Sequence, residues 1–121
     1  MNILRGGVIL DRNGSREFMK TCAALAREKK ATDILALDIS GLTTIADYFL
    51  LLTAANNRQA TAIADYLLEE NEQKPLRMEG YQEGRWILLD YGALIVHIFQ
   101  EEEREYYNLE RLWGDAEKEE L

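Results

Sequence analysis

The chain has 121 residues, a length typical of a single domain that can bury one hydrophobic core without disulfides or metals. Its 14 Lys and Arg residues and 22 Asp and Glu residues give a net charge of −8, which disfavours direct binding to the phosphate backbone of DNA or RNA. The first ten residues contain two glycines and no long apolar run, and no run is long enough to span a membrane. We therefore expect a cytoplasmic protein with no signal peptide and no membrane partner.

The excess of acidic residues allows two interpretations. A high net charge keeps a small protein soluble and needs no further function. The same charge also steers a protein toward a basic protein partner by long-range attraction. Composition alone leaves both interpretations open.

The first half of the chain predicts an arm, a helix and two strands. The segments RGG and DRNG mark residues 1–13 as a loosely held arm. A helix is expected from Ser15 to Lys30, where Cys22, the only cysteine, favours a small core residue over a reactive thiol. Residues 33–40 and 48–54 are expected to be strands, and the apolar run YFLLLTA of the second suits a strand covered on both faces. The helix carries one apolar face, made of Phe18, Cys22, Leu25 and Ala26.

The second half predicts a helix, three strands and a final helix. Asn56 is a suitable N-cap, Gln59 can complete a capping box, and Pro75 follows the helix. The segments LRMEGYQ, RWILLD and ALIVHIF predict strands, and the last helix is expected from Glu101 to Trp113. The acidic tail after Gly114 is expected to be frayed. The residues expected to face inward are Ala60, Ile63, Ala64, Leu67 and Leu68 in the first of these helices and Tyr106, Leu109, Leu112 and Trp113 in the last.

This order of elements predicts the α/β (α+β) class, with a single mixed β-sheet of about five strands and helices packed on it. The expected organisation is an arm at residues 1–13, a domain at 14–116 and an acidic tail at 117–121.

Sequence motifs for catalysis are missing. No Gly-x-Gly-x-x-Gly or Walker loop is present, and one histidine with one distant cysteine is a poor start for a metal site. Two-metal phosphoryl transfer needs two carboxylates two residues apart on a strand, but the first strand offers Asp38 and Ser40. Acidic pairs such as Glu70 and Glu72 fall on helices, where positions i and i+2 diverge. We therefore expect no catalytic residue, no metal and no cofactor.

The segment WILLDYGALIVHIF, residues 86–99, predicts a hairpin with unusual residues on one face. A two-residue turn at 91–92, whose glycine suits a positive φ, pairs Trp86 with His97 and Leu88 with Ile95. Strand alternation puts these four side chains on one face, opposite a purely aliphatic face. A bulged three-residue turn would shift the pairing by one residue.

Two interpretations of the Trp86 and His97 face remain open. A helix could cover it, which would make the two residues a packed pair in the core. Alternatively, the face could be an exposed aromatic and aliphatic patch, which in a soluble protein usually marks a binding surface.

Four segments of the chain, spanning about residues 30 to 116, resemble the ribosomal silencing factor family, also called the Iojap family. They are ADYFLLLTA, RQATAIADYL, EGYQEGRWILLDYGALIVHIF and REYYNLERLWGDA. One departure is that Ala54 and Asn56 stand where the family usually has Gly and Ser, although Asn56 can still cap the helix. The matching residues are Asp47-Tyr48-Phe49, Arg58-Gln59, Glu79-Gly80, Trp86, Asp90, His97, Arg104, Tyr107, Leu109-Glu110 and Leu112-Trp113.

The resemblance implies a nucleotidyltransferase-like fold without a working active site. It also implies binding to the large ribosomal subunit at the fourteenth large-subunit ribosomal protein, a block of subunit joining, repressed translation and a possible homodimer. His97 is then expected to act as a hydrogen-bonding partner and not as a ligand or base. The expected partner-binding residues are Glu79, Trp86, Leu88, Asp90, Tyr91, Ile95 and His97.

Two alternatives belong to other classes. A nucleotidyltransferase-like enzyme acting on a nucleotide or RNA end would need a carboxylate pair that the sequence does not offer on a strand. A general interaction module would not co-sediment with the large ribosomal subunit.

Overall fold

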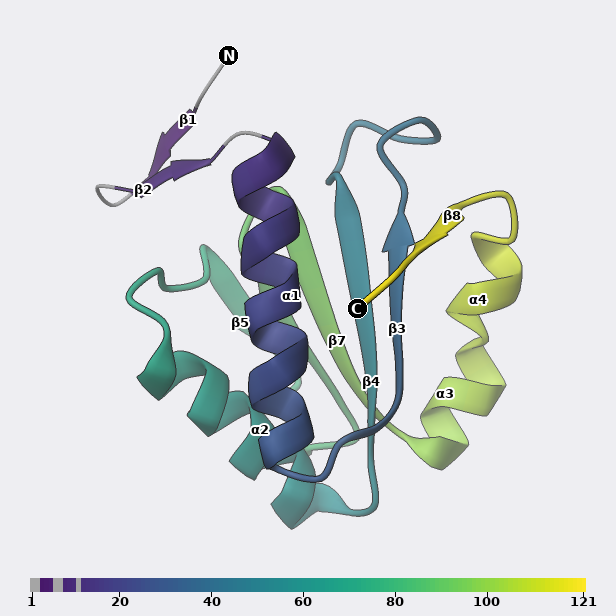
Figure 1. Cartoon of the computed structure of the whole chain (residues 1–121). Helices are drawn as coiled ribbons and strands as arrows, with labels where there is room; N and C mark the ends of the chain where they lie inside the picture. Colours follow the sequence, from purple (N-terminus) through teal and green to yellow (C-terminus); the bar gives the residue numbers. More distant parts are fainter. Residues whose placement is uncertain (1–2, 6–7, 11) are drawn as a thin grey trace.

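The computed structural model describes the backbone of residues 3–5, 8–10 and 12–121, and the side chains of residues 14–121. Figure 1 shows the arrangement of the elements. In chain order they are β1 (Ile3–Arg5), β2 (Val8–Leu10), α1 (Arg12–Glu28), β3 (Thr32–Asp38), β4 (Tyr48–Ala54), α2 (Asn57–Glu70), β5 (Arg77–Glu79), β6 (Trp86–Asp90), β7 (Leu94–Gln100), α3 (Glu101–Tyr107), α4 (Leu109–Leu112) and β8 (Glu117–Glu119).

Six strands form one mixed sheet in the order β5-β6-β7-β4-β3-β8. β4 and β7 run parallel, and the other neighbouring pairs of this sheet are antiparallel. The predicted mixed sheet with packed helices is therefore confirmed. The strand beyond the expected number is β8, which forms from the acidic tail.

The tail is thus ordered instead of frayed. Residues 117–119 pair with residues 36–38 of β3. Arg16 on α1 also forms an ion pair with Glu119, with Nε and Oε2 3.2 Å apart. These contacts hold a segment whose charged composition carries no strand signal of its own.

The predicted arm lies only partly within the described residues. β1 and β2 pair antiparallel as a separate two-stranded sheet. α1 begins at Arg12, three residues before the helix start expected from the sequence.

α1 and α2 pack on one face of the sheet, called the first face below (Figure 1). β4 lies between the two faces and all seven of its residues are buried, as its apolar run predicted. Burial raises the pKa of the Cys22 thiol to about 12, which agrees with its interpretation as a core residue. The fully buried helix residues include Met19, Cys22 and Ala26 from α1 and Ala60, Ile63, Ala64 and Leu67 from α2.

The start of α2 shows the predicted cap. The Asn56 side chain accepts a hydrogen bond from the backbone N–H of Gln59 at 2.8 Å. The Gln59 side chain accepts from the Ala55 N–H and donates to the carbonyl oxygens of Lys29 and Lys30. The cap therefore also ties α2 to the end of α1.

α3 and α4 pack on the second face, beside β3 and away from α1 and α2 (Figure 1). The last helix was predicted as continuous, but it breaks at Asn108, whose φ of 45° is left-handed. Asparagine tolerates this conformation better than most residues. The break turns Tyr106 and Leu112 to solvent, 81% and 72% exposed, so their predicted inward orientation is wrong. Leu109 and Trp113 do pack against the sheet.

None of the helices in the described part of the chain combines the length and apolar character needed to cross a membrane.

Candidate partner-binding surface

The β6–β7 hairpin turns one residue later than predicted. The backbone N–H of Tyr91 donates to the carbonyl oxygen of Leu94 at 2.8 Å, so Gly92 and Ala93 form the turn. Gly92 has the expected positive φ, at 89°. Tyr91 directly follows β6, and its ring is buried on the first face against Phe18, with ring centroids 4.9 Å apart.

This turn changes the pairing but not the faces. Trp86 lies opposite Phe99 and Leu88 lies opposite His97, so the predicted pairs of Trp86 with His97 and Leu88 with Ile95 are wrong. The register differs by two residues, and side chains alternate with a period of two. The predicted face therefore survives, with Trp86, Leu88, Ile95 and His97 all on the second face.

Trp86 and His97 are linked diagonally. The indole Nε1–H of Trp86 donates to Nδ1 of His97 at 3.1 Å, so the histidine acts as the expected hydrogen-bonding partner. His97 is only 4% exposed, and burial lowers its pKa to about 4, so the ring is neutral at pH 7. Because Nδ1 accepts, the proton of the neutral ring is on Nε2.

Trp86 sits in a cluster of aromatic rings. It stacks on Phe99 with centroids 4.9 Å apart and contacts Tyr107 of α3 at 4.7 Å. His97 packs edge-on against Phe49 at 4.7 Å. His97 is buried, which fits the interpretation of a packed core residue, whereas Trp86 is half-buried and packs against the same cluster. These contacts hold the indole in one orientation.

α3 packs mainly on β7 and β4 and contacts Trp86 of β6 through Tyr107, while the second face is less covered over β5 and the rest of β6. This less covered part consists of Arg77, Glu79, Trp86, Leu88 and Asp90, and is called the β5–β6 surface below. Arg77 lies opposite Asp90 with Nε and Oδ2 3.0 Å apart, and also pairs with Glu79. Glu79 lies opposite half-buried Leu88. The surface therefore combines an aromatic anchor, an apolar neighbour and a net negative rim.

Three predicted partner-binding residues are not at this surface. Tyr91 is fully buried on the first face, so its assignment to the surface is wrong. Ile95 and His97 have the correct face but are buried, because the hydrophobic cluster under α3 and α4 includes them. They support the surface from below and do not reach it. The remaining residues, Glu79, Trp86, Leu88 and Asp90, do lie together there.

Sequence reasoning missed two residues of this region. Tyr107, 49% exposed, lies against Trp86 and extends the surface onto α3. Tyr107 falls within REYYNLERLWGDA, one of the four segments that carry the family resemblance, so the sequence did contain a signal for it. Arg77 could have been found only with the correct strand register, which places it opposite Asp90.

The geometry also bears on the alternative of a metal-dependent enzyme. Asp38 on β3 lies opposite Glu117 of β8, and its Oδ1 accepts hydrogen bonds from the backbone N–H and hydroxyl of Ser40. Among residues 14–121, no three His, Cys, Asp or Glu side chains lie close enough together to hold a metal ion. β8 also carries Glu119, two residues after Glu117, but the Glu119 carboxylate forms an ion pair with Arg16.

The sequence and the fold of this chain match those of known proteins. The family model described as "Ribosomal silencing factor during starvation" matches residues 12–121. This chain belongs to the ribosomal silencing factor family. The resemblance predicted from the four sequence blocks is confirmed, and the match also includes α1 and β8.

Other members of the ribosomal silencing factor family agree in sequence and fold. The ribosomal silencing factor of Bacillus subtilis is 43% identical over 104 residues, which are 84% of this chain and 88% of that protein. A crystal structure of a Chromobacterium violaceum protein has a TM-score of 0.78 and 32% identity, covering 88% of this chain and 90% of that one. A Bacillus halodurans structure has a TM-score of 0.75 and 35% identity, covering 88% and 99%.

Proposed function

We propose that this chain binds the large ribosomal subunit at its fourteenth ribosomal protein, blocks joining of the small subunit by steric exclusion, and so represses translation. The observation that carries the proposal is membership of the ribosomal silencing factor family over residues 12–121. Relatives in this family carry the name of silencing factors and not of enzymes, which supports a non-catalytic regulator without a cofactor.

The β5–β6 surface is the proposed docking site. Aromatic residues that are rigid and half-exposed provide most of the binding energy in many protein interfaces, and Trp86 has this character. Leu88 lies beside it as an apolar neighbour. Tyr107 extends the apolar area to α3.

The charge of the protein supports a basic partner. The net charge is −8, and α3 begins with three glutamates, of which Glu102 and Glu103 lie within ion-pair distance of Arg85, the residue before Trp86. A basic ribosomal protein would be attracted by this charge, whereas ribosomal RNA would be repelled. The proposal therefore places the contact on protein and not on RNA, in the cytoplasm, and includes a homodimer.

Sedimentation with separated ribosomal subunits tests the proposal. The protein should travel with large subunits and remain at the top of the gradient with small subunits. Purified fourteenth ribosomal protein should compete for it. Equal sedimentation with both subunits, or with neither, would remove the ribosomal assignment.

A further inference from the structure

The helix pair α3–α4 has little apolar burial to hold it on the sheet. Every residue of α3 and α4 is described, and none is fully buried. The helices have 7 and 4 residues, and a left-handed residue at Asn108 separates them. Helices this short are not stable by themselves. Besides the packing of Leu109 and Trp113 and the ion pair of Glu103 with Arg85, their position on the second face depends on further polar contacts.

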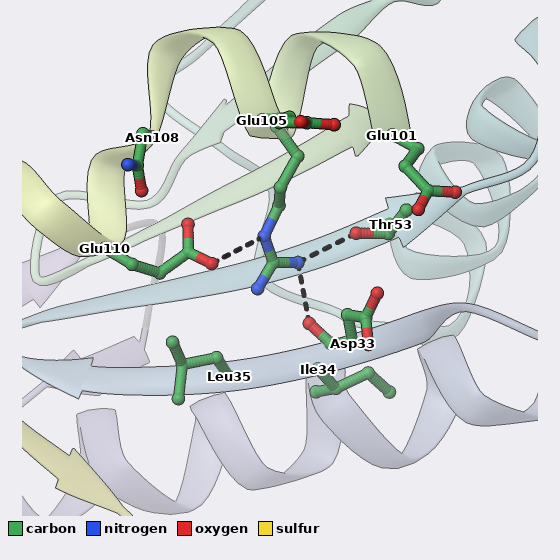
Figure 2. Close-up of a pocket in the computed structure, with 9 residues that line it drawn as sticks. Asp33, Ile34, Leu35, Thr53, Glu101, Glu105, Asn108 and Glu110 are labelled. Carbon is green, nitrogen blue, oxygen red and sulfur yellow. Dashed lines mark hydrogen bonds and ion pairs between the residues drawn. The ribbon is translucent and has the colours of Figure 1, made fainter.

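Arg104 of α3 makes those contacts. Its Nη1 donates to the carbonyl oxygen of Asp33 at 2.6 Å and to the Thr53 hydroxyl at 2.9 Å. Its Nε donates to Oε2 of Glu110 at 3.2 Å. In Figure 2 the three dashed lines end on these acceptors, which come from β3, β4 and α4. One guanidinium thus connects α3 to two strands and to the helix beyond the break.

The surroundings of Arg104 favour this role. Its side chain is only 11% exposed, so its hydrogen bonds are shielded from water. It lines a hollow of about 530 Å³ in which Glu101, Glu105 and Glu110 are also present. The fixed fork of a guanidinium can satisfy acceptors in several directions, which a lysine ammonium on a flexible stem cannot reproduce.

Arg104 lies one helical turn before Tyr107, and the Tyr107 ring is 4.7 Å from that of Trp86. We infer that Arg104 is a positioning residue for partner binding, which fixes α3 so that Tyr107 rests against Trp86 and completes the docking site. This inference rests on the proposed function for its effect on binding. Its structural part, the placement of Tyr107 on Trp86, can be measured without a partner.

The first test needs no ribosome. In a Trp113→Phe background, Trp86 is the only tryptophan, and its fluorescence reports contact with Tyr107. Arg104→Gln and Arg104→Lys should shift the emission of Trp86 as Tyr107→Ala does, while the exposed ion-pair variant Arg16→Gln should not. Emission of Arg104→Gln equal to that of the parent overturns the inference, whether or not the protein binds ribosomes.

The second test is a double-mutant cycle of affinity for large subunits. Arg104→Gln should weaken binding about tenfold in the parent protein, within the range found for coupled neighbours. In a Tyr107→Ala background the same change should have little further effect, because the residue through which it acts is gone. If the double variant loses affinity by the full product of the two single-variant factors, Arg104 does not act through Tyr107, and the inference is overturned. Failure of the parent protein to bind would instead contradict the proposed function.

Discussion

His97 is buried among aromatic rings, and the protein must keep it neutral. Its Nδ1 accepts from the Trp86 indole, and its Nε2 has no partner among the described residues. Protonation would place a charge in an apolar environment and remove the acceptor for Trp86. Burial therefore lowers the pKa of His97 to about 4. His97 thus links the buried cluster to the half-buried Trp86.

The lowered pKa predicts a specific loss of stability in acid. The unfolded chain binds a proton at His97 below about pH 6.5, whereas the folded chain does not until about pH 4. The contribution of neutral His97 to the free energy of unfolding is complete above pH 6.5 and is lost as the pH falls toward 4. At pH 5 the loss amounts to about 2 kcal/mol. Urea unfolding at pH 7 and pH 5 measures this loss.

His97→Gln is the matched control, because it retains an acceptor but does not titrate, so its stability should fall less between the two pH values. His97 is the only histidine, so its imidazole proton resonances can be followed directly by NMR. A titration midpoint near 6.5 would contradict the buried neutral ring.

Trp86→Ala should affect binding far more than folding. If the indole is the anchor, its removal costs roughly 2–4 kcal/mol of binding free energy. This corresponds to about 30-fold to 1000-fold in affinity for large subunits. Because Trp86 is half-buried and bonded to His97, unfolding free energy should also fall, by about 1–3 kcal/mol. Paired measurements of melting temperature and subunit affinity separate the two effects.

Tyr66→Ala is a control on α2, where the hydroxyl donates to Glu28 far from the docking site in the fold. It should leave subunit affinity unchanged. A Trp86→Ala protein that is stable and binds normally would remove Trp86 from the interface.

At the scale of elements, the turn between β5 and β6 contains two glycines with positive φ, Gly80 and Gly84, and Gly80 has the closer neighbour. Gly80 has a φ of 77°, and an added Cβ would overlap the backbone oxygen of Trp86. Glycine is the residue that adopts this conformation without strain. The turn places β5 beside β6, so β5 forms one half of the proposed docking site.

Gly80→Ala should therefore destabilise the domain by about 2–3 kcal/mol or more, since it combines a strained φ with a clash against backbone. Gly41→Ala is the control, because an added Cβ there has no neighbour within 4 Å. Its unfolding free energy should stay within about 0.5 kcal/mol of the parent. Comparable stability of the two variants in urea would show that the turn is not constrained as described.

Elements with strong local signals could be predicted from the sequence. The apolar run of β4 and the cap and stripe of α2 carried enough information to define those elements. The faces of the hairpin were also correct, because alternation survives a shift of two residues. The position of the turn could not be predicted, because it depends on the burial of Tyr91 against Phe18, which is a tertiary contact. The same holds for β8, whose pairing with β3 is not encoded in its own charged sequence.

Strand alternation also allowed part of the candidate site to be predicted. Glu79, Trp86, Leu88 and Asp90 follow from strand alternation and the family resemblance. Whether Ile95 and His97 reach solvent depends on how α3 and α4 cover the sheet. That covering depends on the break at Asn108 and the contacts of Arg104, which no periodic pattern reveals.

At the scale of the molecule, the two faces of the sheet differ. α1 and α2 seal the first face, while α3 and α4 leave the second face less covered over β5 and most of β6. The proposed docking site lies on this second face of a chain whose net charge is −8. Such a molecule can act by occupying a surface on its partner, which fits the proposed exclusion of the small subunit.

The most direct measurement is the joining of separated ribosomal subunits, followed on sucrose gradients with increasing amounts of protein. Joined ribosomes should decrease as the protein saturates the large subunit. The Trp86→Ala variant, added at the same concentration, should leave subunit joining unchanged. Full joining of large subunits that demonstrably carry the protein would contradict steric exclusion.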